Sequence, residues 1–526
     1  MPDVLDDQPL VVRRFKLPVG QNDKDQPDSL ADYEVALLQN ALVSSRGKRE
    51  TRPGMTLVAD DVGSVAVSGL GAFYPEGGTK QLLMDANGVI YKYIGSGVWT
   101  SIASGLTGGV KAKFIVGNGY ALRINGVDNA RSYDGTTVAD EGNVDASCPI
   151  ATDGIFHQNM FIMAINTKSY FWWGSVLGKT FARSVNAHKV GDKDNGLFKK
   201  LLNFSLTDSH GFLYFKTNSI YFIDSSAADP ANWAKILIES EHGLAASDTA
   251  VVTGSDGTGR GDVLYLANDG VSDGKYKFRV RSLSRTINDT LHDSGIVSEK
   301  IQATLDNINP AQIEKACAIH FDNKYFLAFA SGSSSYNDTV AVLDLSTSDP
   351  ENGFYDWSVW QGWNVACWAI FEVSGAKGLY YGEASGDTVV FQALSGTSDN
   401  GAAIEFIERG RAEDFGFPEL DKIIDFVEVV FEQTDDTVVT IKAAVDGGDM
   451  TTMGTVNVAN QSPTLPINLP FDLVAPGKTR KKIPLDDLGR CRDIQIEVYH
   501  SDLDKRIKFL GYTLCGHPEN LELGED

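Results

Sequence analysis

Short apolar segments recur along the chain from about Phe73 to Phe391, and pairs of turn residues separate them. The clearest unit runs from Leu82 to Tyr93, where two apolar segments flank Asn87-Gly88. The same pattern surrounds Asn118-Gly119 and Asp269-Gly270. Asn-Gly and Asp-Gly pairs tolerate the positive φ angles of a tight hairpin, so the pattern predicts a series of antiparallel hairpins. A long hairpin series must protect its edge strands, which favours closure into a ring of blades or a barrel.

Three regions differ in this pattern. Residues 1–60 are polar at first and predict an extended N-terminal arm, followed by a short helix over about Ala31–Gln39 and a hairpin that turns at Arg46-Gly47. Residues 61–400 hold the hairpin series, enough for on the order of seven blades at about 40–50 residues per blade. Residues 401–526 alternate over longer segments and predict a β-sandwich. The predicted fold class is all-β: a β-propeller with an extended N-terminal arm and a C-terminal β-sandwich, or platform, domain.

Composition and charge narrow the class of protein. The 526 residues are 42% hydrophobic and 10% aromatic, which is enough for packed cores. A formal net charge of -24 argues against a surface that grips nucleic acid. The five cysteines form no CxxC motif, so we expect neither a disulfide scaffold nor a zinc ribbon. No secretory signal is expected at the N-terminus, and no apolar run of about eighteen residues predicts a membrane span.

The sequence predicts no catalytic, cofactor-binding or metal-binding residue. The eight histidines form no HxH or HxxxH pair. Gly174–Thr180 resembles a phosphate loop but is one residue short and lacks a βαβ context. The Gly-rich Gly254–Asp262 is expected to be a flexible hairpin loop. Trp357, Trp360 and their neighbours form a cluster that suits either a core or, if exposed, a sugar-stacking platform.

Three short stretches carry a resemblance to a known family. In Asn40–Met55 an Asn-containing segment leads through a glycine turn to Arg-Pro-Gly. The second stretch is Glu241–Ser247, and the third is Tyr355–Trp360, which leads into Gly382–Asp387. In these stretches and in its layout the chain resembles the tail nozzle and tail tubular B-type proteins of short-tailed bacteriophages.

The resemblance implies a structural, non-enzymatic virion protein that is made in the host cytoplasm and resides in the tail. Such a protein forms a ring, a homohexamer, below the portal and adaptor. It continues the DNA channel, retains the genome and docks fibres or receptor-binding proteins, while double-stranded DNA passes without specific binding.

The basic end of the chain supplies a candidate partner interface. We expect its side chains to contact an acidic partner subunit, with simple solvation as the alternative. Together with one asparagine, the candidate interface residues are Arg13, Arg14, Lys16, Asn40, Lys48, Arg49 and Arg52.

Two other functions stay open at this point. One is a tail-tip or fibre-associated propeller that binds host glycans through exposed Trp or Tyr side chains. The other is a polysaccharide hydrolase on a propeller scaffold, which would require a cleft with two close carboxylates.

Overall fold

The chain folds into two compact units in a computed structural model. Unit 1 comprises Met1–Met55, Val342–Gln361 and Ser395–Asp526, and unit 2 comprises Thr56–Ala341 and Gly362–Leu394. No helix among the described residues is long and apolar enough to cross a membrane. The structure describes residues 10–15, 20–43, 48–95, 97–144, 146–174, 182–191, 196–206, 209–254, 261–272, 275–285, 290–434, 436–458 and 477–518.

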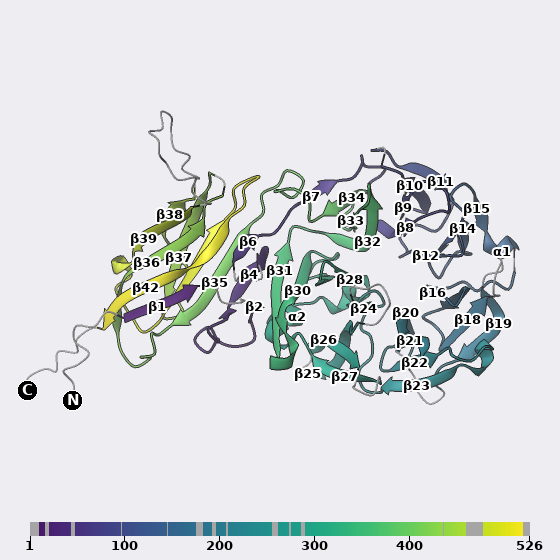
Figure 1. The fold of residues 1–526 in the computed structure, drawn as a ribbon, viewed down its shortest axis with the longest axis horizontal. Coiled ribbons are helices and arrows are strands. Elements are labelled where there is room, and N and C mark those ends of the chain that lie inside the picture. The colour runs from purple at the N-terminus through teal and green to yellow at the C-terminus, as the bar shows by residue number, and fades with distance from the viewer. Residues whose placement is uncertain are drawn as a thin grey trace, which may run out of the picture. The chain divides into compact units, whose positions relative to one another are not determined.

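Unit 2 is built from six four-stranded sheets and a three-stranded group, counted over the described residues (Figure 1). The first five sheets take four strands each in chain order. Their strands are β8 (Val67–Phe73), β9 (Gln81–Ala86), β10 (Val89–Tyr93), β11 (Thr100–Ala103), β12 (Lys113–Gly117), β13 (Tyr120–Ile124), β14 (Arg131–Tyr133), β15 (Val138–Asp140), β16 (Asp153–His157), β17 (Met160–Ala164), β18 (Tyr170–Gly174), β19 (Ala182–Lys189), β20 (Phe198–Ser205), β21 (His210–Lys216), β22 (Ile220–Asp224), β23 (Ala234–Glu239), β24 (Val251–Val252), β25 (Val263–Ser272), β26 (Lys275–Arg285) and β27 (Leu291–Ile296). The remaining two sheets use β28 (Cys317–Phe321), β29 (Lys324–Phe329) and the start of β30 (Thr339–Asp349), then β32 (Val365–Val373), β33 (Ala376–Glu383), β34 (Val390–Ala393) and β7 (Met55–Leu57).

The seven sheets close into a ring, so unit 2 is a seven-bladed β-propeller. The first strand of each sheet lies nearest the centre, and the last contact of the ring joins β32 back to β8 (Figure 1). The seventh blade takes its last strand, β7, from the N-terminal side of the chain. Just after β7, the Val58 N–H donates to the Val390 carbonyl at 3.0 Å. Closure of this kind leaves no long unpaired edge between the first and last blades.

Two of the predicted hairpin turns are confirmed and one is different. Asn87 and Gly88 have φ angles of 49° and 72° and join β9 to β10, and Asn118-Gly119 likewise joins β12 to β13. Asp269-Gly270 is no turn, because β25 continues to Ser272 and its register shifts between Asn268 and Val271. The pair therefore forms a β-bulge, which also uses the positive φ of 90° at Gly270.

Unit 1 is a β-sandwich assembled from separate parts of the chain. Apolar side chains from two sheets, such as Val427 and Val429 on one and Ile441 and Ile496 on the other, share one buried core. One sheet contains β39 (Lys478–Pro484), β36 (Lys422–Glu432), β42 (Lys508–Pro518), β6 (Arg49–Thr51), β5 (Ala41–Val43), β1 (Leu10–Phe15) and β40 (Arg490–Cys491). Within unit 1 the other runs from β30 through β31 (Phe354–Gln361), β4 (Leu37–Gln39), β35 (Phe406–Glu413), β41 (Ile494–His500) and β37 (Val438–Val445) to β38 (Thr451–Asn457). The sandwich thus also draws strands from outside residues 401–526.

The N-terminal segment is extended but pairs within its own chain. β1 lies antiparallel to β42 along its whole length, with Leu10 opposite Gly516. Where a helix was predicted over residues 31–39, the structure has a turn, β3 (Glu34–Val35) and β4. β3 pairs with β2 (Gly20–Gln21), and the Gln21 side chain accepts a hydrogen bond from the backbone of Leu38 at 3.0 Å. These tertiary contacts outweigh the weak local helix preference. The hairpin of β5 and β6 is confirmed, and its predicted turn lies outside the described residues.

Candidate functional site

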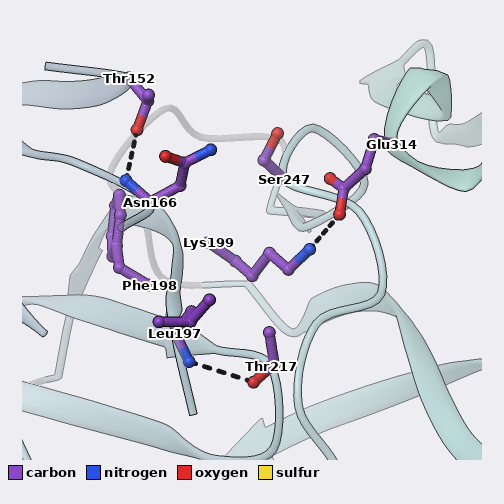
Figure 2. A pocket seen from close by; sticks show the side chains of 8 residues that line it. All are labelled: Thr152, Asn166, Leu197, Phe198, Lys199, Thr217, Ser247 and Glu314. Atoms are coloured by element: carbon purple, nitrogen blue, oxygen red, sulfur yellow. Dashed lines mark hydrogen bonds and ion pairs between the residues drawn. The ribbon is translucent and has the colours of Figure 1, made fainter. Parts of the chain in front are cut away.

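Two pockets lie side by side at one face of the propeller. Their lining includes residues just before the first strands of several blades, such as Thr152 before β16 and Ser247 before β24. Lys199 and Glu314 form an ion pair and line both pockets, whose volumes are about 190 and 360 Å³. The smaller pocket, drawn in Figure 2, is lined by Thr152, Asn166, Leu197, Phe198, Lys199, Thr217, Ser247 and Glu314. Its one carboxylate is already paired, so it lacks the two carboxylates of a glycoside hydrolase.

An ionic network occupies the start of the innermost strands. Lys113 on β12 contacts Asp153 at 2.9 Å and Asp248 at 2.6 Å. Lys111 also contacts Asp248, at 2.5 Å. The second oxygen of Asp153 accepts a hydrogen bond at 2.7 Å from the backbone of Leu201 on β20. Three blades thus contribute charges to one connected group, and a fourth blade contributes a backbone N–H.

The network fixes the charge state of its members. Burial alone would lower the pKa of Lys113, but Asp153 and Asp248 hold that pKa above its ordinary value. Burial would raise the pKa of Asp248, yet Lys111 and Lys113 hold it well below its usual range. Neighbouring Lys200 has a lowered pKa, mainly because it is buried. With its pKa held so low, Asp248 is not suited to act as a general acid near neutral pH.

The network also spans the propeller axis. Lys113 belongs to the second blade, and Asp248 leads into the fifth, with two blades between them along the ring. Their contact at 2.6 Å requires the two side chains to meet across the centre. The central channel of the propeller is therefore obstructed by charged side chains at this end.

Three of the predicted interface residues lie in the interior of unit 1. Asn40, Arg49 and Arg52 are 3%, 2% and 0% exposed. The Arg52 guanidinium makes a two-pronged ion pair with Asp399 at 2.8 and 2.6 Å, and its Nε donates to the Asn40 side chain at 2.9 Å. Arg49 makes a similar pair with Glu408, with both distances at 2.8 Å. A partner contact by these side chains would require these internal bonds to break.

The structure describes the other four predicted interface residues only in part. Lys48 is partly exposed and pairs with Glu432 within unit 1. The backbone of Arg13 and Arg14 lies in β1, but their side chains fall outside the described residues, as does the whole of Lys16. The contact of these residues with a partner stays a prediction.

The tryptophan cluster belongs to the cores. Trp357, Trp360 and Trp363 are each 0% exposed. The Trp360 indole N–H donates to the carbonyl of Ala41 at 3.1 Å and to the hydroxyl of Ser358 at 3.0 Å. These three rings offer no exposed face on which a sugar could stack.

None of the described cysteines forms a disulfide, and they differ in burial. Burial raises the pKa of Cys317 to about 12 and of Cys491 to about 11. Since the thiolate is the nucleophile, we expect iodoacetamide at pH 8 to label partly exposed Cys148 in the native protein, and Cys317 and Cys491 only after unfolding. Peptide mass spectrometry of native and urea-treated samples measures this order. Equal labelling of Cys148 and Cys317 in the native protein would contradict it.

A third group of polar residues could hold a metal ion. Side-chain ligand atoms of Glu239, His242 and Asp293 lie within 4.8 Å of one another. Neither this group nor the ionic network is recognisable in the sequence, because each includes residues that are too far apart along the chain to form a motif. His242 lies within the stretch Glu241–Ser247, which was noted above for its resemblance to a known family and not for its chemistry.

Comparison with known proteins adds little beyond the fold itself. No protein-family description matches the sequence, and no curated protein is similar to it. Among solved structures, the N-terminal domain of Nup159 is similar with a TM-score of 0.38 at 9% identity, over 68% of this chain and 99% of that chain. Sqt1 of Saccharomyces cerevisiae gives 0.37 at 10%, over 65% and 99%. An exo-beta-1,3-galactanase from Phanerochaete chrysosporium gives 0.25 at 10%, over 87% and 100%. All three TM-scores are below 0.5, so no property of these proteins is transferred to this chain.

Proposed function

We propose that the protein is a structural subunit of a short bacteriophage tail, a nozzle that assembles as a ring. The observation that carries the proposal is the combination of a seven-bladed propeller with a β-sandwich made from both ends of the chain. A propeller beside a β-rich platform is what the resemblance described above implies.

The residues that carry the resemblance have demanding structural roles. Asn40 adopts a positive φ of 52° and accepts hydrogen bonds from Arg52 and from the Gln361 backbone. A Cβ atom at Gly54 would lie 1.9 Å from the carbonyl oxygen of Ser398, so the tight approach needs glycine there. The Asn-to-Arg-Pro-Gly segment thus joins three separate stretches of unit 1, which supports a role in building the platform.

In this proposal, the contacts inside the propeller determine where DNA would pass. Because Lys113 and Asp248 meet across the propeller axis, DNA would pass between ring subunits and not through a single propeller. The strongly acidic chain would then line or flank a passage that repels the DNA phosphates.

Assembly tests the proposal. We expect the purified full chain to form a ring, a hexamer, in the presence of portal and adaptor proteins, as measured by multi-angle light scattering and negative-stain microscopy. Lys80→Met removes the charge of an exposed ion pair in unit 2. This variant should assemble as the wild type does, which would show that assembly does not depend on that surface charge. A chain that stays monomeric with both partners present would refute the nozzle function.

A further inference from the structure

The fourth and fifth blades bring together a histidine and three carboxylates. Glu239 ends β23, and His242 follows in the next loop. Asp269 lies in the bulge of β25, and Asp293 lies on β27. We propose that Glu239, His242 and Asp293 bind a divalent transition-metal ion of the Zn²⁺ type, with Asp269 orienting the histidine.

The distances suit such an ion. The Nδ1 atom of His242 lies 3.6 Å from a carboxylate oxygen of Glu239 and 4.0 Å from one of Asp293. Ligand atoms bound at roughly 2.0–2.1 Å to a tetrahedral zinc ion lie about 3.3–3.4 Å apart, so small side-chain adjustments complete the geometry. The group is partly exposed, which lets an ion enter from solvent.

The histidine has the arrangement of a metal ligand. Its Nδ1 atom is buried and has no hydrogen-bond partner among the described residues. Its other nitrogen, Nε2, points to the Asp269 side chain at 3.9 Å. A metal-bound imidazole usually presents its second N–H to a carboxylate, which fixes the tautomer and the ring orientation.

Two buried polar atoms on β25 have no hydrogen-bond partner among the described residues. The Asp269 side chain is 8% exposed, and its Oδ1 atom has no hydrogen-bond partner in the described structure. The Tyr265 hydroxyl is also unpartnered in that part of the chain, although the residue is 0% exposed. Buried polar groups normally have partners, and a metal ion with its bound water would supply them here.

The backbone holds the ligands in place. Register shifts of the sheet occur beside Glu239, Asp269 and Asp293, and such bulges redirect side chains. A Cβ atom at position 243 would lie 2.2 Å from the Asn218 nitrogen, so Gly243 fixes His242 closely against the turn between β21 and β22.

Hydrogen bonds and charge complete the support around the ligands. Three backbone N–H groups, those of residues 240–242, donate to Oε1 of Glu239, the oxygen that lies 3.6 Å from His242, and hold this carboxylate in place. Arg281 contacts Asp293 at 2.7 Å and Asp269 at 3.3 Å, which orients both carboxylates. The three carboxylates of this group outnumber the two guanidinium groups beside them, those of Arg279 and Arg281, so a bound cation would add compensating positive charge.

Zinc binding by the full chain tests the proposal. After removal of metal with EDTA, we expect the protein to take up one Zn²⁺ per chain at pH 7.5, measured by elemental mass spectrometry after dialysis and by competition with a chromophoric chelator. His242→Ala should weaken Zn²⁺ binding by about tenfold or more. His210→Ala, at the exposed first residue of β21, is the matched control and should bind Zn²⁺ as the wild type does.

A second measurement does not depend on the folding of a variant. An ion that binds only the native state raises the melting temperature, so Zn²⁺ should raise it in the wild type, and EDTA should reverse the shift. Equal Zn²⁺ binding by wild type and His242→Ala would overturn the proposal. So would a wild type that binds no Zn²⁺ and shows no thermal shift.

Discussion

Replacing Arg52 by methionine is expected to lower the free energy of unfolding of unit 1 by about 3–5 kcal/mol, because Asp399 would be left buried without its partner. The substitution also removes the hydrogen bond to Asn40, whose left-handed backbone it supports. Urea denaturation measures the loss of stability. Hydrogen exchange of the backbone amides in β5 and β6 shows whether the loss affects unit 1. Arg480→Met is the control, since Arg480 is 60% exposed and its pair with Glu428 at 3.8 Å should contribute about 1 kcal/mol at most.

A double variant separates the charge from the packing. Changing Arg52 to methionine and Asp399 to leucine together removes both charges, and we expect it to recover part of the lost stability. The single variant unfolding at the same urea concentration as the wild type would show that the pair has no such role.

Replacing Lys113 by methionine is expected to destabilise the propeller by about 2–4 kcal/mol at neutral pH, because Asp153 and Asp248 lose their shared partner. The expectation is slightly below that for Arg52, since the Lys113 side chain is 18% exposed. Thermal and urea unfolding of unit 2 measures the change. Lys80→Met is the control, because Lys80 is 45% exposed in its pair with Glu372.

The same variant has a characteristic pH dependence. The pKa of Asp248 is depressed in the folded state, so its contribution is complete above the ordinary aspartate pKa of about 4 and is lost as the pH falls through the lower folded value. The difference between wild type and Lys113→Met should therefore shrink as the pH falls below about 4. A difference that stays constant from pH 7 to pH 3 would argue against an ionic origin.

The sequence predicted best where local chemistry decides the structure. Asn87-Gly88 and Asn118-Gly119 form the predicted turns because their side chains suit a positive φ at both central positions. Asp269-Gly270 has the same local signal but becomes a bulge, since β25 and β26 continue to pair beyond it. The helix predicted over residues 31–39 is replaced by short strands that pair with segments distant in the sequence. Pairing partners of that kind leave no local pattern.

The functional groups were harder to predict than the fold. The ionic network of Lys113, Asp153 and Asp248 forms only because the first strands of several blades begin at the same face. His242 looks like an isolated histidine in the sequence, and only the ring brings Asp293 beside it. Arg49 and Arg52 look like a basic surface, yet Glu408 and Asp399 come from the far end of the chain and allow both arginines to be buried. In an acidic chain such partners are numerous, and their choice depends on topology.

The closing strand of the propeller sets the order in which the protein can mature. β7 emerges from the ribosome before any blade, but its partner β34 belongs to the last one. The sandwich is similar, because β6 pairs with β5 on one side and with β42, near the C-terminus, on the other. The propeller can therefore complete its last sheet only after Ala393 has been synthesised, and the sandwich only after nearly the whole chain. Until then the early strands have exposed edges, so nascent or truncated chains should be prone to aggregation and in need of chaperones.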